Sequence, residues 1–363
     1  MRVKRSGWFI EAALALLLLV TKAQTVTIDG KAVDADKSNV APAAEVPSGT
    51  YLNNFESIQL TKDVLANLTD LQLSDVSLFY FDDDSNPEKQ SSQCKVMPGD
   101  SLYPKDTVWN LLDILSDGAL IKTVPLGSAC YDVRYPVSSL LNITNLAQIQ
   151  LVINFARNTN TRLVIRNTGH DFLGKNTGQG ALSLWTYHLK GIEILRDYQS
   201  AGRRYKGPAF KIGAGVVVHE LYEAAEREGF TAVGGECRTV GVACGYAVGG
   251  GHSPVTPIHG LASDQILSIN LVTPDGQFIT ADDTQNQDLF WAFRGGGPAT
   301  FGVVTSMMIK VHEKTVFSGM TWDTTTKDMN ITDKTSGKPL KHTGDAILSS
   351  QQLKITVTVE CRD

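Results

Sequence analysis

Helix-like and strand-like hydrophobic patterns alternate along residues 131–313 of this chain. Two stretches repeat apolar residues at the spacing of one helix face, namely Ile149, Val152, Ile153 and Ala156, and then Val218, Leu221, Tyr222 and Ala225. A further helix is predicted over 288–293. Short apolar runs predict strands over 163–165, 181–185, 191–195, 209–217, 265–272, 277–280 and 302–311. Pro274-Asp275-Gly276 predicts a hairpin turn. Interleaved helices and strands predict the α+β or α/β class.

The pattern changes on both sides of this region. Residues 24–130 are polar and irregular apart from a helix predicted over 108–115, so we expect an N-terminal extension packed on a main domain at 131–313. Beyond residue 313 the apolar signal fades, and only 353–359 alternates like a strand. We expect residues 314–363 to be an incomplete part of a further domain.

The first 23 residues have the three parts of an export signal. Positions 2, 4 and 5 are basic, residues 12–20 are apolar, and residues 21–23 offer a small-residue cleavage site. The apolar stretch is short for a membrane span. We therefore predict a cleaved signal peptide and a secreted protein, with an uncleaved signal anchor as the alternative.

Export permits disulfides and N-glycosylation. Cys94 and Cys130 flank the helix predicted over 108–115 and lie in Pro/Gly-rich surroundings, so we predict a disulfide between them. Three sequons begin at Asn67, Asn142 and Asn330. These features agree with the predicted export.

Composition narrows the choice of partners. The 363 residues are 42% hydrophobic and 20% charged, which is ordinary for a globular protein. The net charge is −5, and no Lys/Arg cluster suited to a phosphate backbone is present, which argues against nucleic acid. No segment after the signal is apolar enough for a membrane span, and we expect a monomer that acts on a small molecule.

Two glycine-rich turns each carry one nucleophilic side chain. Residues 166–171 follow a predicted strand and contain His170, and residues 234–237 end in Cys237. A backbone that needs glycine at such turns is one that a bulky group approaches closely. An imidazole nitrogen can bond the 8α-methyl carbon of a flavin, and a thiolate can bond ring carbon C6. We predict a flavin held by two covalent bonds, one through each residue.

Each residue alone has an ordinary interpretation, the histidine as a polar loop residue and the cysteine as an inert core thiol. A zinc site is the competing constellation, with Cys237, Cys244, His252 and His259 as ligands. Its spacings argue against it, because the paired cysteines are seven residues apart, too far for a short zinc knuckle.

A glycine-rich run over residues 241–251 follows the cysteine turn, and a triple glycine occupies 295–297. In the first run glycines recur four residues apart, so on a helix they would line one face, and free N–H groups there could bind a pyrophosphate. A tightly packed corner without a ligand is the alternative. A G-x-G-x-x-G finger after a first strand is absent, which disfavours a Rossmann site.

These stretches resemble the flavin-binding domain of the vanillyl-alcohol oxidase superfamily, also called the PCMH-type FAD-binding domain. The resemblance rests on residues 162–185, 234–264 and 288–306, and a further block at 94–130 is similar to the extension of fungal secreted members. The branch that it resembles most is the berberine bridge enzyme-like oxidases. It implies two α/β subdomains with FAD between them, preceded by an N-terminal extension and followed by an incomplete substrate domain.

The resemblance also implies site residues. His170 occupies the place that bonds the 8α carbon, and Cys237 the place that bonds C6. The other residues that it assigns to FAD are Arg166, Asn167, Thr168, Gly169, Asp171, Val240, Gly241, Gly245, Gly249, Gly250, Gly251, His252, Asp264, Gln265, Ile266 and Val303. Arg238 stands where proline is common in the family, and Cys244 where glycine is common.

The implied function is an FAD-dependent oxidase that takes a hydride from a small organic substrate to flavin N5 and passes the electrons to O2. A secondary-metabolite or small-alcohol substrate is expected. No catalytic base is assigned, because family members usually supply it from the substrate domain. The alternatives are a truncated, inactive flavin-fold protein or binding module and, last, a secreted structural protein.

Overall fold

The computed structural model describes residues 52–70, 75–81, 94–123, 139–298 and 301–315, together with four strands outside these ranges. The strands are β1 (Val26–Ile28) paired with β2 (Lys31–Val33), and β14 (Phe317–Thr325) paired with β15 (Gln352–Glu360). The predicted signal peptide at 1–23, Cys130 and Asn330 lie outside the described residues. Within the described part, no helix combines the length and apolar character that a membrane span requires.

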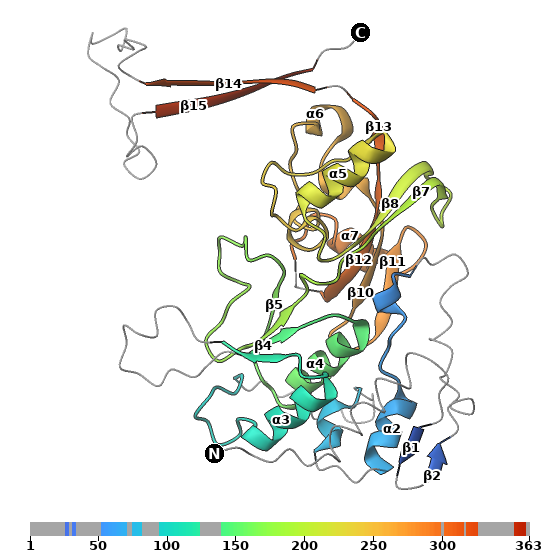
Figure 1. The fold of residues 1–363 in the computed structure, drawn as a ribbon, viewed down its shortest axis with the longest axis vertical. Helices are drawn as coiled ribbons and strands as arrows, with labels where there is room; N and C mark the ends of the chain where they lie inside the picture. Colours follow the sequence, from blue (N-terminus) through green and yellow to red (C-terminus); the bar gives the residue numbers. More distant parts are fainter. Residues whose placement is uncertain are drawn as a thin grey trace.

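One sheet has four strands in the order β3-β4-β6-β5 and lies below the second sheet in Figure 1. Its strands are β3 (Leu120–Lys122), β4 (Ser139–Asn142), β5 (Leu163–Arg166) and β6 (Leu182–Trp185). β6 is parallel to both β4 and β5, whereas β3 is antiparallel to β4. The helix α4 (Leu146–Asn158) connects β4 to β5, as a parallel pairing requires.

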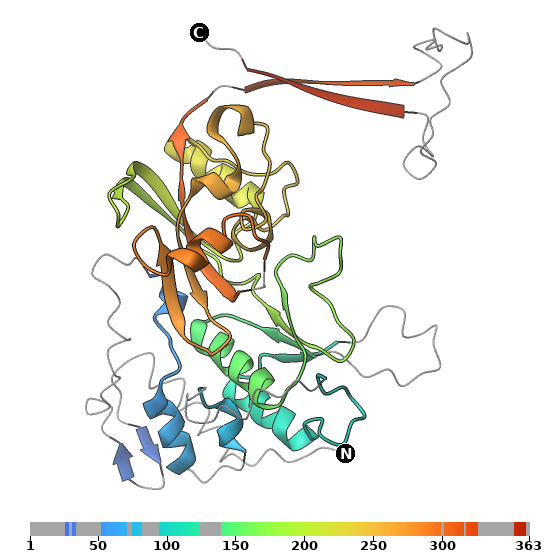
Figure 2. The ribbon, with the colours of Figure 1, turned by 180° about the vertical axis from the view of Figure 1, so that it is seen from behind.

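The helix α4 is buried over almost its whole circumference. Its predicted apolar stripe lies in the core, but polar side chains between the apolar ones are buried as well. Gln150 accepts a hydrogen bond from the amide of Leu60 at 2.8 Å and donates to the carbonyl of Gly276 at 2.9 Å. Asn154 donates to the carbonyl of Phe79 at 3.0 Å. The helix therefore holds segments that precede the predicted domain as well as a hairpin of the second sheet, beside which it runs in Figure 2.

The N-terminal segments contribute to the core. They are η2 (Asn54–Glu56), α2 (Lys62–Asp70), η3 (Val76–Phe79) and α3 (Asp106–Leu115). The rings of Phe79 and Trp109 pack on Phe155 of α4, with centroids 5.7 and 5.1 Å away. Because α3 packs in the same core as α4 and β3 pairs with β4, this core includes residues on both sides of residue 130, where the extension was expected to meet the main domain.

The second sheet has five antiparallel strands in the order β11-β10-β12-β8-β7. They are β7 (Ile192–Gln199), β8 (Lys206–Gly213), β10 (Ile266–Val272), β11 (Phe278–Asp282) and β12 (Val303–Lys310). The smaller elements are α5 (Val218–Glu228), β9 (Phe230–Thr231), η6 (Val242–Tyr246, a π-helix), α6 (Thr256–His259), η7 (Ala262–Gln265), α7 (Gln287–Ala292) and β13 (His312–Glu313). The predicted hairpin between β10 and β11 is confirmed.

The strand predicted over 209–217 differs most from the structure, because β8 ends at Gly213. The chain after β8 passes against the backbone of residues 187–189. A Cβ added at Gly213 would clash with the carbonyl of Leu189, and one at Gly215 would clash with the carbonyl of Tyr187. These two glycines therefore allow two chain segments to touch where the sheets meet. The mixed helix and sheet architecture confirms the predicted fold class.

Candidate functional site

A cavity of about 280 Å³ lies where β5, β6 and the start of α5 meet the turn after residue 234. Its volume is near the lower end of the range for small-molecule sites. The lining residues are Arg166, Asn167, Thr168, His170, Trp185, Tyr187, Val217, His219 and Thr239. Four of these were predicted to contact a cofactor, namely Arg166, Asn167, Thr168 and His170.

His170 enters the cavity from the loop that follows β5. Gly169 just before it has φ +92°, a left-handed conformation that favours glycine. The Asp171 carboxylate accepts hydrogen bonds from the backbone amides of Leu173, Lys175 and Asn176. Asp171 therefore shapes its own loop and thereby holds His170 in place.

His170 and Cys237 converge on the hydroxyl group of Thr239. The distance from His170 Nε2 to Thr239 Oγ1 is 2.8 Å, and the distance from Cys237 Sγ to the same oxygen is 3.8 Å. Both side chains are exposed. The structure thus brings the two predicted nucleophiles to one place, although His170 follows β5 and Cys237 follows β9, far apart in the sequence.

The turn that carries Cys237 rests on two tyrosine rings. A Cβ at Gly234 would come within 2.9 Å of Tyr222, and one at Gly235 within 3.2 Å of Tyr246. The hydroxyl of Tyr222 donates to the carbonyl of Gly235 at 2.9 Å. Burial raises the pKa of Tyr222 to about 12, and the negative charge of Glu236 adds to the rise. Tyr222 therefore stays protonated at neutral pH and keeps this hydrogen bond.

Asn167 connects the cavity to the second sheet. Its side-chain amide donates to Thr186 Oγ1 at 3.0 Å and to the carbonyl of Ala214 at 2.8 Å. Its Oδ1 atom is buried and has no hydrogen-bond partner within the described part of the chain. A Cβ added at Gly241 would clash with this oxygen. The glycine therefore allows the close approach of the 166–171 loop.

Aromatic side chains form one wall of the cavity. Trp185 and Tyr187 stack with ring centroids 5.9 Å apart, and Trp185 Nε1 donates to the carbonyl of Asn167 at 2.8 Å. Lys190 Nζ lies 4.1 Å from the centre of the Tyr187 ring and forms an ion pair with Glu220 at 2.9 Å. These contacts fix the orientation of both rings.

His219, at the start of α5, faces the same cavity. Its Nδ1 atom is 3.1 Å from the carbonyl oxygen of Arg238. A carbonyl oxygen only accepts hydrogen bonds, so Nδ1 carries the proton, and the neutral ring keeps a lone pair on Nε2. His219 can therefore take up a proton at Nε2.

The remaining residues assigned to FAD do not line this cavity. Val240 and Gly241 hold the cysteine turn against α5 and the chain before it, through backbone bonds to residues 218 and 217. Added Cβ atoms at Gly245 and Gly250 would meet nothing within 4 Å, so the backbone there faces open space. Gly249 bonds back to residue 245, Gly251 has a left-handed φ of +73°, and the backbone carbonyl of His252 accepts from Tyr246.

The residues expected near adenosine lie elsewhere. Asp264 and Ile266 line a second cavity of about 310 Å³. Gln265 is buried, donates to the carbonyls of His259 and Leu261, and pairs with His312, while Val303 is a core residue. The structure therefore separates this group from His170 and Cys237.

The other cysteines and histidines have distinct surroundings. Cys244 packs between the two cores, and burial raises the pKa of its thiol to about 12. Cys94 is exposed and Cys130 lies outside the described residues, so their disulfide stays a prediction. In the part of the chain that the structure describes, no three His, Cys, Asp or Glu side chains gather as metal ligands.

The sequence reasoning missed five residues of the cavity. They are Trp185, Tyr187, Val217, His219 and Thr239. Thr239 stands two residues after Cys237, a signal that was available. Trp185 ends β6, Tyr187 and Val217 lie in connections, and His219 lies at the start of α5, and no periodic pattern reveals that these positions meet in space.

Comparison with known proteins points to a family. Residues 138–282 match the model described as an FAD binding domain. The chain is 40% identical over 278 residues to the FAD-linked oxidoreductase ZEB1 of Gibberella zeae. The aligned region covers 63% of this chain and 49% of that protein. The chain spans about half the length of the curated relatives it matches.

Two solved structures extend the likeness to the fold. The VAO-type flavoprotein MtVAO615 of Myceliophthora thermophila C1 has a TM-score of 0.59 and 36% identity, over 64% of this chain and 52% of that one. A variant of BBE-like 1 from Physcomitrella patens has a TM-score of 0.50 and 26% identity, over 60% and 47%. The predicted resemblance is confirmed. Residues 138–282 therefore form an FAD binding domain, and the chain is similar to fungal FAD-linked oxidoreductases and VAO-type flavoproteins.

Proposed function

We propose that this protein is an FAD-dependent oxidase whose flavin is bonded to His170 and Cys237. The supporting observation is that His170 Nε2 and Cys237 Sγ both contact Thr239 Oγ1, at 2.8 and 3.8 Å, beside a cavity. Two nucleophiles from separate chain segments thus stand where one ring system could meet both.

The residues present fit a flavin in three respects. The cavity beside His170 has walls that carry stacked aromatic rings, suited to a flat ring. The buried Oδ1 of Asn167 is an acceptor that a hydrogen-bond donor of a ligand would satisfy. The backbone at Gly245 and Gly250 faces open space, which lets a bulky group such as a pyrophosphate approach the chain closely.

When bound, flavin supplies the two-electron chemistry, in which a hydride leaves the substrate and O2 takes up the electrons as hydrogen peroxide. The chain orients the reactants and excludes water. Trp185 and Tyr187 form the rigid wall, and His219 is the cavity residue that we assign to hold a proton, at Nε2. His219→Gln should lower kcat by about 10² or more while the flavin stays attached.

The substrate and setting complete the proposal. We propose a secondary metabolite or a small alcohol as substrate, a monomeric enzyme, and secretion directed by the N-terminal signal. Of the two sequons in the described residues, Asn67 is exposed on α2, whereas Asn142 is half-buried at the end of β4. Glycosylation is therefore proposed first at Asn67, and a mass shift after glycosidase treatment tests it.

The attachment is tested by acid precipitation of the purified protein. The yellow colour should remain with the precipitate and leave it only after proteolysis. His170→Ala and Cys237→Ala should each leave one bond, whereas Cys94→Ala is the matched control on an exposed cysteine outside the cavity. Colourless protein, or colour that stays in the acid supernatant, would refute the attachment.

Catalysis is tested apart from attachment. A truncated, inactive flavin protein would pass the acid test but release no peroxide with any alcohol or secondary metabolite offered. Peroxide release that requires substrate and disappears under nitrogen supports the oxidase. A coloured protein without peroxide would support the inactive alternative.

A further inference from the structure

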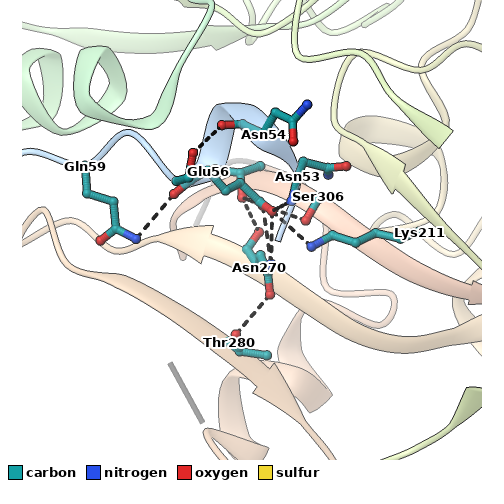
Figure 3. A network of polar contacts seen from close by, with 10 residues as sticks. Asn53, Asn54, Glu56, Gln59, Lys211, Asn270, Thr280 and Ser306 are labelled. Atoms are coloured by element: carbon teal, nitrogen blue, oxygen red, sulfur yellow. Dashed lines mark hydrogen bonds and ion pairs between the residues drawn. The ribbon is translucent and has the colours of Figure 1, made fainter. Parts of the chain in front are cut away.

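A fully buried carboxylate joins the N-terminal segment to the five-stranded sheet. Glu56, the last residue of η2, has no exposed surface. Figure 3 shows the donors that surround it. Lys211 Nζ of β8 is 3.0 Å from Oε2, and Asn270 Nδ2 of β10 is 3.3 Å from both oxygens. The backbone N–H of Asn53 donates to Oε2 at 2.8 Å. Every lone pair of the carboxylate therefore has a donor within reach.

Two consecutive residues of β12 also donate to this carboxylate. Thr305 Oγ1 and Ser306 Oγ each lie 2.6 Å from Glu56 Oε1. In a regular strand, successive side chains point to opposite faces. Here the pairing of β12 with β10 shifts, since Asn270 pairs with Ser306 and Leu271 pairs with Val304. Thr305 is thus the extra residue of a bulge, a device that re-aims a side chain next to functional sites.

The bulge also aims the backbone of Thr305 at the cavity. Its carbonyl accepts from the Ala214 amide at 2.8 Å, and the Ala214 carbonyl accepts from Asn167 Nδ2 at 2.8 Å. Asn167 lines the cavity. A continuous chain of hydrogen bonds thus runs from Glu56 through Thr305 and Ala214 to Asn167.

We propose that Glu56 is a positioning residue of the cavity and acts through Thr305 and Ala214 on Asn167. Thr305 has no paired residue in the register of β10, and its hydroxyl lies 2.6 Å from Glu56 Oε1 but 3.2 Å from the carbonyl oxygen of Asn270 on β10, so the shorter bond to the charged carboxylate contributes most to its orientation. Ser306 is held by pairing with Asn270 on one side and Gly213 on the other, whatever its side chain does. The inference rests on the proposed function only for the identity of the ligand in the cavity, which is the flavin.

The negative charge of Glu56 contributes to this positioning role. Lys211 is as buried as its partner, and burial lowers its pKa while Glu56 acts in the opposite direction. Removing one member of a buried ion pair leaves the other charge uncompensated. Glu56→Gln therefore tests the charge and the hydrogen bonds of this carboxylate together. Thr305→Val is the milder variant, because valine has nearly the shape of threonine and the backbone carbonyl of residue 305 remains.

The test is amide hydrogen exchange of the whole purified chain. Exchange of the Ala214 amide should be at least about tenfold faster in Thr305→Val and Glu56→Gln, relative to the Leu182 amide of the other sheet in the same protein. Ser306→Ala is the matched control, because it removes a bond of equal length to the same oxygen. It should change the ratio by less than about threefold.

A second readout uses the flavin content of the purified variants. Thr305→Val should carry severalfold less flavin than Ser306→Ala, with similar melting temperatures. An unchanged Ala214 exchange ratio in Thr305→Val refutes the positioning role even if flavin is bound. A wild-type protein without flavin refutes the proposed function, and the exchange ratio still decides whether Glu56 positions Asn167.

Discussion

The substitution Phe79→Ala tests whether the segments before residue 130 are part of the fold. Phe79 lies in η3, has no exposed surface, and stacks on Phe155 with centroids 5.7 Å apart and an interplanar angle of 26°. Truncating a buried phenylalanine costs about 3–5 kcal/mol. The loss of the aromatic pair accounts for about 0.5–1.5 kcal/mol of this. Thermal unfolding should shift down by roughly 6–20 °C.

The assay is urea and thermal unfolding followed by circular dichroism. Phe172→Ala is the control, because the Phe172 ring is fully exposed, and its removal should stay within about 0.5 kcal/mol. The double variant Phe79→Ala/Phe155→Ala should show a coupling of about 0.5–1.5 kcal/mol. A loss below about 1 kcal/mol for Phe79→Ala would mean that this segment is a detachable extension, and the account of the core would fail.

Three further predictions concern the site and its surroundings. Gly241→Ala should displace Asn167, lower the free energy of unfolding by about 1–3 kcal/mol and reduce flavin content, and unchanged melting would contradict this. Thiol labelling of folded protein produced without flavin separates the two cysteines. Cys244→Ala should leave the labelling rate unchanged because burial raises the pKa of that thiol, whereas Cys237→Ala should remove one fast-reacting, exposed thiol. Burial, a neighbouring histidine and a lysine lower the pKa of His312 to about 4 in the folded protein. Between pH 6.5 and 4 the unfolded chain therefore binds a proton that the folded protein does not, and the free energy of unfolding decreases as the pH falls through this range. His312→Gln should remove about 1–2 kcal/mol of that loss in urea titrations at pH 7 and pH 4.5, and an equal loss in both proteins would contradict it.

Regular elements with a periodic apolar pattern or a distinctive turn could be predicted from the sequence. The helix α4 and the hairpin of β10 and β11 follow from periodicity and from a Pro-Asp-Gly turn, which are local signals. The polar positions of α4 could not be placed. Gln150 and Asn154 are buried because they bind segments far away in the sequence, and no local pattern carries that information.

The sequence alone predicted only part of the candidate site. His170 and Cys237 stand out because each follows glycines and carries distinctive chemistry. Glu56 and Thr305 do not, since a lone acidic residue in a polar stretch and a threonine in a strand have ordinary surface interpretations. Their role depends on a bulge and on a pairing across the sheet, which only the folded chain displays.

The account depends most directly on double attachment of the flavin, and the intact mass of the acid-denatured protein measures it. Wild type, His170→Ala and Cys237→Ala should each keep the mass of one FAD, because either bond suffices to retain it. The double variant should have the mass of the polypeptide alone. A wild-type mass without FAD, or a double variant that keeps it, would contradict attachment through this pair of residues.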